Sequence, residues 1–168
     1  MKTLKIMALM VAAMILLGAA EALAASTSAN LTIGATVSNT GKLTISPSTI
    51  SFPDADPDTV GFIAPSEGPV TVDAKAKTSG GGGITLDVLA NGDLTTGSDI
   101  IAISNIAWTS GSPDYNGTGT MNKTTAQPVG SWSNSGWHQG VLNFRLANSW
   151  SYAVGSYSAS ATFTLTYP

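Results

Sequence analysis

The chain has 168 residues with no cysteine and one histidine, so thiol catalysis, thiolate metal sites and disulfides are excluded. After residue 24, five basic residues face nine acidic ones, which is a net charge of −4. With so few basic residues we expect no basic patch on the surface, and this argues against nucleic acid as a partner.

The first 24 residues have the pattern of a secretion signal. Two lysines precede an apolar run over residues 6–17, which is too short to span a bilayer comfortably, and small residues at 22–24 suit cleavage. An uncleaved N-terminal anchor is the alternative. We predict a signal peptide at 1–24 and one domain at 25–168, located in the periplasm, at the cell surface or outside the cell, with no membrane span in the mature form.

Alternating apolar residues predict short strands along the whole mature chain. The alternation is clear at residues 29–37 and clearest in the C-terminal stretch 157–167, where apolar residues alternate with serine and threonine. Further strands are expected at residues 42–52 with a break at Pro47, and at 70–77, 84–88, 99–108, 118–123, 128–132 and 142–146.

Two local features refine this pattern. Residues 70–77 and 84–88 are joined by a glycine-rich link and look like a hairpin, and the change of face at Ser104-Asn105 predicts a β-bulge. No window of ten or more residues after the signal has helical periodicity. The sequence therefore predicts an all-β fold, an Ig-like antiparallel β-sandwich of about eight or nine short strands.

Catalytic chemistry is not evident in the sequence. His138 is the only histidine, and its Gly-Trp-His-Gln-Gly surroundings indicate a loop or surface residue, not the base of a catalytic triad. Asp54, Asp56 and Asp58 alternate as calcium ligands do, but the glycine and distal glutamate of an EF-hand loop are missing, so a solvated acidic loop is the preferred interpretation. We expect no enzyme activity and no cofactor.

Tryptophans suggest a binding function as an alternative. Trp108 and Trp150 are interpreted as core residues, whereas Trp132 and Trp137 flank a Ser/Asn/Gly turn and are expected to be exposed. Exposed indole rings can stack on sugar rings. A carbohydrate-binding surface module that uses Trp132 and Trp137 on a surface glycan is therefore the alternative function.

The order of the parts resembles a known family. A signal-like start and an alternating first segment are followed by Leu43-Thr-Ile-Ser-Pro-Ser-Thr-Ile-Ser-Phe52 with an Asp-rich loop, then Pro69-Val-Thr-Val-Asp-Ala-Lys75, and finally Gly155-Ser-Tyr157 before a terminal strand. This arrangement is similar to the spore-coat-U domain and to the archaic chaperone–usher pilins that share it.

The resemblance implies a structural or adhesive surface subunit that lacks one strand of its sandwich. A neighbouring copy, or a periplasmic chaperone, would fill the missing place with an extended segment. Residues 25–37 fit the donor role, with Leu31, Ile33 and Val37 as the buried side chains and Gly34 allowing close backbone approach. The alternative is that this segment is the first strand of its own sandwich.

Overall fold

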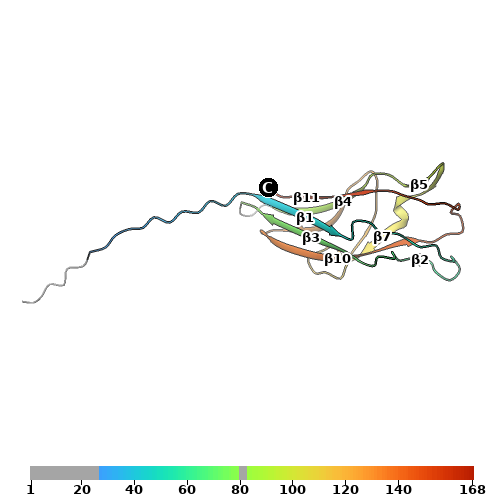
Figure 1. The fold of residues 1–168 in the computed structure, drawn as a ribbon, viewed down its shortest axis with the longest axis horizontal. Helices are drawn as coiled ribbons and strands as arrows, with labels where there is room; N and C mark the ends of the chain where they lie inside the picture. The colour runs from blue at the N-terminus through green and yellow to red at the C-terminus, as the bar shows by residue number, and fades with distance from the viewer. Residues whose placement is uncertain (1–26, 80–82) are drawn as a thin grey trace, which may run out of the picture. The chain divides into compact units, whose positions relative to one another are not determined.

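The computed structural model describes residues 27–79 and 83–168, so the predicted signal peptide lies outside the described residues. The regular secondary structure of the described part consists almost entirely of antiparallel strands, which confirms the predicted fold class (Figure 1). It contains eleven strands: β1 (Thr40–Ser46), β2 (Phe62–Ile63), β3 (Val70–Lys77), β4 (Ile84–Ala90), β5 (Leu94–Thr96), β6 (Asp99–Ile101), β7 (Ile106–Thr109), β8 (Thr118–Thr120), β9 (Gln127–Trp132), β10 (Gly136–Ala147) and β11 (Ala161–Thr166).

Two sheets form the layers of the sandwich. The larger sheet has the order β1-β3-β10-β7-β8, with β2 also paired to β10, and the smaller one has the order β11-β4-β9. Figure 1 shows β11 and β4 on one side and β1, β3 and β10 on the other. Strands β5 and β6 form a separate hairpin. The number of strands in the described residues exceeds the predicted eight or nine because several strands have only two or three residues.

The core lies between the two sheets and follows from the alternation of the central strands. In β3, Val72 and Ala74 are buried at the inward positions, while the residues between them are less buried. Leu86 and Val88 are likewise buried at the inward positions of β4, which belongs to the opposite sheet. Burial of the larger of these side chains contributes about 1.5–3 kcal/mol each, so these strands contribute strongly to stability.

The hairpin predicted for residues 70–77 and 84–88 is wrong. Strand β3 pairs with β1 and β10, whereas β4 pairs with β11 and β9, so the glycine-rich link joins two different sheets. Period two fixes which face of a strand is buried, but it does not fix the partner. Both strands bury one face in the same core, and each takes a central position in its own layer.

The bulge predicted at Ser104-Asn105 is also wrong, because a 3₁₀ turn at Ile103–Asn105 separates β6 from β7. The turn is held by a hydrogen bond from the Ile103 backbone N–H to the Asp93 carboxylate at 2.9 Å. It lets Ile101, Ile103 and Ile106 all be buried, although their spacing fits no single strand.

Two predicted strands do not form in the described residues. The stretch 47–52 has no strand, because Pro47 has no N–H to continue the pairing of β1 with β3, and Ile50 and Phe52 instead pack against the core as partly buried side chains. The segment 29–37 is likewise without strand structure. The compact unit comprises Val37–Pro168.

Candidate assembly edge

Strands β1 and β11 each end their sheet on one side of the sandwich, and β8 and β9 end the two sheets on the other side. Among the described residues β1 pairs only with β3, and β11 pairs only with β4. Each therefore presents one row of backbone N–H and C=O groups with no partner strand, a feature that natural proteins usually cover or block. We call these two strands, with their inward side chains, the open edge.

The open edge corresponds to a missing strand of an Ig-type sandwich. In that fold one sheet has the order A-B-E-D and the other places strand F between C and G. Here β1-β3-β10-β7 follows the first order, and β11-β4 occupies the places of F and C. No strand in the described residues takes the place of G beside β11.

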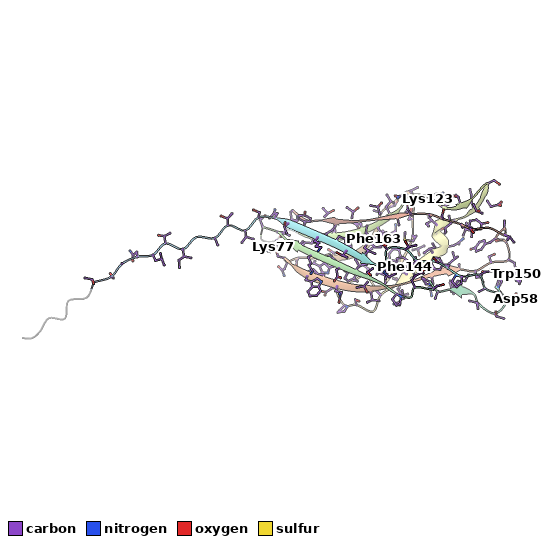
Figure 2. The ribbon with its side chains drawn as sticks, viewed as in Figure 1. Asp58, Lys77, Lys123, Phe144, Trp150 and Phe163 are labelled. Carbon is purple, nitrogen blue, oxygen red and sulfur yellow. The ribbon has the colours of Figure 1, made fainter. Side chains whose placement is uncertain are left out.

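The inward side chains of the open edge are incompletely covered. Leu43 and Ile45 of β1, and Phe163 and Leu165 of β11, pack against the core but remain partly exposed. The corresponding residues of the central strands β3 and β4 are at most 4% exposed. Figure 2 labels Phe163, which lies on β11, and Phe144, which lies on β10 of the other sheet.

One end of the open edge is fixed by contacts between the start of β1 and the chain end after β11. The Asn39 side-chain amide donates a hydrogen bond to the Pro168 carbonyl at 2.7 Å. The ring of Tyr167 lies against Gly41, where a Cβ atom would have no room. Because the start of β1 meets the end of β11, the two strands run in opposite directions.

The predicted donor residues are exposed. The side chains of Leu31, Ile33 and Val37 are 82%, 85% and 75% exposed, and no heavy atom lies within 4 Å of a Cβ built on Gly34. Segment 27–39 has no strand partner among the described residues. The alternative, that it forms the first strand of its own sandwich, stays a prediction.

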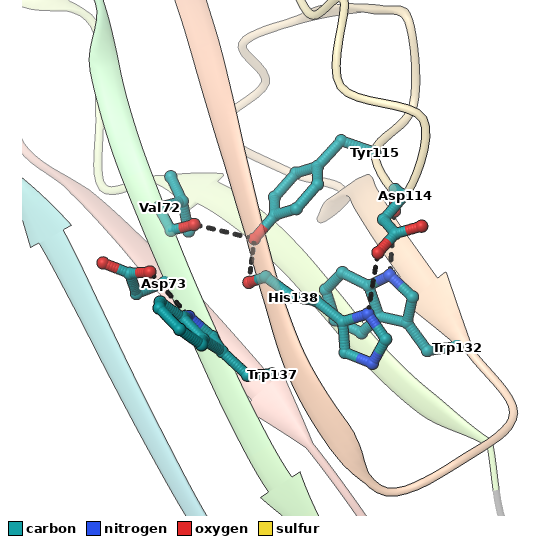
Figure 3. Close-up of polar contacts among 7 residues, drawn as sticks. All are labelled: Val72, Asp73, Asp114, Tyr115, Trp132, Trp137 and His138. Atoms are coloured by element: carbon teal, nitrogen blue, oxygen red, sulfur yellow. Dashed lines mark hydrogen bonds and ion pairs between the residues drawn. The ribbon is translucent and has the colours of Figure 1, made fainter.

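A cluster of polar and aromatic side chains joins the two sheets near β9, which ends the smaller sheet opposite β11 (Figure 3). The Asp114 carboxylate lies 3.0 Å from His138 Nδ1 on β10, and the Asp114 carbonyl accepts a hydrogen bond from Trp132 Nε1 on β9 at 2.9 Å. The rings of Trp132 and His138 stack with centroids 4.4 Å apart. The Tyr115 hydroxyl reaches the carbonyls of Val72 and His138, at 2.9 and 3.0 Å.

This cluster corrects two predictions. His138 lies within a strand and is half-buried, so it is not a loop residue, and Trp132 is only 8% exposed, so it offers no face to a sugar. Burial, with the nearby Asp73 and Asp114 carboxylates, raises the pKa of Tyr115 far above its usual range, so its hydroxyl stays a donor.

The arrangement braces the fold and lacks the parts of a catalytic triad. Buried His138 Nε2 has no hydrogen-bond partner among the described residues, so no hydroxyl nucleophile is positioned by it. The aspartate instead ties a loop to β9 in one sheet and to β10 in the other. Tyr115 in turn ties the same loop to β3 and β10 through the carbonyls of Val72 and His138.

The Asp-rich loop uses its side chains within the protein. Asp56 accepts a hydrogen bond from the Asp58 backbone N–H at 2.9 Å, and Asp58 accepts one from Trp150 Nε1 at 3.0 Å (Figure 2). Among the described residues no three acidic, histidine or cysteine side chains converge as metal ligands. Trp150 is 70% exposed, so its predicted place in the core is wrong, whereas Trp108 is buried as predicted.

Comparison with known proteins adds no relative. No family model matches the chain, and neither curated proteins nor solved structures gave a significant match. The resemblance to the spore-coat-U domain and the pilins therefore stays a prediction. In the described part of the chain, no helix is long and apolar enough to cross a membrane.

Proposed function

We propose that the chain is a secreted structural subunit that assembles by strand donation, in which residues 27–39 of one copy pair with the open edge of the next. The carrying observation is that one chain has both an uncovered sandwich edge and an unpaired segment with alternating, exposed apolar side chains. Main-chain hydrogen bonds would supply affinity, and alternate side chains would supply specificity. Secretion rests on the signal-like pattern of residues 1–24.

The chemistry of the two parts is complementary. Leu31 and Ile33 are two residues apart, as are Phe163 and Leu165, so both segments present apolar side chains with the period of a strand. Burying each of the three exposed donor side chains would contribute about 1.5–3 kcal/mol. Covering the unpaired backbone groups of β11 would also remove an edge that is prone to non-specific pairing.

Chain direction favours donation between copies. Residues 27–39 lead directly into β1, which runs opposite to β11. If the segment folded back on its own β1 as a hairpin, it would run parallel to β11. A segment from another copy has no such restriction and can take the antiparallel direction, which gives the more stable pairing and which all the named strand pairs of this fold use.

Moving the donor segment tests this proposal. We expect a variant with residues 27–39 transferred to follow Pro168, through a short glycine–asparagine turn, to be a monomer. The transferred segment would run back antiparallel to β11 and cover the open edge of its own chain. Its midpoint of thermal unfolding should exceed that of a chain that simply lacks 27–39 by roughly 10 °C.

The matched control carries the transferred segment with Leu31→Asp and Ile33→Asp. It should lose the gain in unfolding temperature, because two carboxylates would enter an apolar site. Equal unfolding temperatures for the transferred, control and deleted chains would show that the open edge does not accept this segment. Analytical ultracentrifugation gives the monomer mass, and calorimetry gives the unfolding temperature.

A further inference from the structure

The sandwich has a second surface with an uneven charge distribution. Of the five cations after residue 24, Lys42, Lys75 and Lys77 lie exposed on the outer faces of β1 and β3. The strand register places Lys42 directly opposite Lys75, and Lys75 directly opposite Trp137 of β10. We call these four residues the basic face. The prediction of no basic patch is wrong here, because the strand register brings together lysines that are distant in the sequence.

None of the three lysines of the basic face forms an ion pair with a described residue, although Asp73 lies on the same outer face of β3, two residues from Lys75. Within residues 27–79 and 83–168 the only lysine ion pair is Lys123 with Asp93, so none of the three lysines has a carboxylate within ion-pair distance. Like charges directly opposite each other on neighbouring strands are destabilising. Lys42 and Lys75 are such a pair in an otherwise acidic protein, so an anionic partner would relieve their repulsion.

Trp137 is held as a flat, accessible ring beside these lysines. It is 62% exposed, and its indole N–H donates to the Asp73 carboxylate at 2.8 Å (Figure 3). Asp73 also accepts from the Gln139 amide at 2.9 Å, and the Lys75 ammonium lies 4.3 Å from the Trp137 ring centroid. These contacts fix the ring before any ligand arrives, which lowers the entropic cost of binding.

We propose that the basic face binds an acidic polysaccharide whose sugar rings carry carboxylates. A pyranose ring would stack on Trp137 in place of the Lys75 ammonium, which would pair with the sugar carboxylate together with Lys42. Thr44 and Gln139, in the next cross-strand row, would meet sugar hydroxyls. The aromatic ring favours a glycan over a purely electrostatic partner, and the lysines favour an acidic glycan over a neutral one.

The test is isothermal titration of the purified chain with oligogalacturonate at low salt, with neutral dextran and single-stranded DNA as comparison polymers. We expect binding to oligogalacturonate only, weakening as salt rises. Trp137→Ala should weaken binding at least about tenfold and Lys75→Gln at least about fivefold, while Trp137→Phe should retain part of it. Circular dichroism checks that each variant is folded.

Two variants are matched controls. Trp150→Ala removes another exposed tryptophan, and Figure 2 places Trp150 at the end of the sandwich opposite Lys77. Lys123→Gln removes one positive charge outside the basic face. Both should bind within about twofold of the unaltered chain. Equal weakening by Trp150→Ala, equal binding of DNA, or no binding of oligogalacturonate at low salt would each overturn the proposal, whatever the outcome of the donor-segment experiments.

Discussion

Ile33→Asp is expected to abolish assembly of the chain while leaving its sandwich folded. Ile33 is 85% exposed in the single chain, so the substitution removes no core contact there. In a donated strand the same position would place a carboxylate against the apolar side chains of the open edge. Burying an unpaired charge is costly enough that we expect the association constant to fall by at least about 100-fold.

Thr32→Asp is the matched control for this substitution. In a strand, residue 32 points to the face opposite residues 31 and 33, so the same charge one position away would stay in water. Sedimentation velocity should show assemblies for Thr32→Asp and monomers for Ile33→Asp. Assemblies of equal size from both variants would mean that the side chains of this segment are not buried between copies.

Gly140→Val is expected to cause a large loss of stability. A Cβ atom on Gly140 would meet the Tyr115 ring at 2.5 Å or closer, so the ring would have to leave its place. Overpacking costs about 1–3 kcal/mol, and loss of the Tyr115 hydrogen bond to the buried Val72 and His138 carbonyls costs about 1–3 kcal/mol more.

Denaturant unfolding measures this effect, with Gly61→Val as the control. No heavy atom lies within 4 Å of a Cβ on Gly61, and its φ is not in the left-handed region, so that substitution should cost little. A free energy of unfolding that is equal for the two variants would show that Tyr115 does not brace the strands. Near-ultraviolet circular dichroism should report the displaced tyrosine ring.

Alternation along the chain was enough to predict the fold class and the faces of most strands. Leu142, Phe144 and Leu146 point inward and Arg145 points outward in β10, as their spacing predicts. The pairing of strands was not predictable, because period two is the same whichever neighbour a strand has. The clearest example is the pair β3 and β4, which was predicted to form a hairpin but lies in two different sheets.

Some parts of the candidate sites could likewise be predicted from the sequence, and others depend on strand pairing. The proposed donor segment was visible in the sequence because its apolar residues alternate with polar ones. The proposed acceptor residues Phe163 and Leu165 gave the same signal as a buried strand, and only the absence of a second neighbour of β11 among the described residues distinguishes them. The basic face gave no local signal, since Lys42 and Lys75 meet only through the register of β1 with β3.

Tyr115 and Asp114 were missed for a related reason. They lie in a loop with no motif, and their role depends on atoms of three strands that are distant in the sequence. The burial of Trp132 follows from the same contacts, because its indole N–H needs the Asp114 carbonyl as a partner. A loop that fastens two sheets together leaves no periodic pattern in the sequence.

Disulfide trapping between two differently sized versions of the chain tests strand donation most directly, because the native chain has no cysteine to compete. One version would carry Ile33→Cys, and the other Phe163→Cys or Leu165→Cys. Donation between copies predicts a disulfide-linked product containing one chain of each size, and no such product when Thr32→Cys replaces Ile33→Cys. If a chain that carries both cysteines forms only an internal disulfide, and the mixture gives no linked pair, the segment belongs to its own sandwich and the account is contradicted.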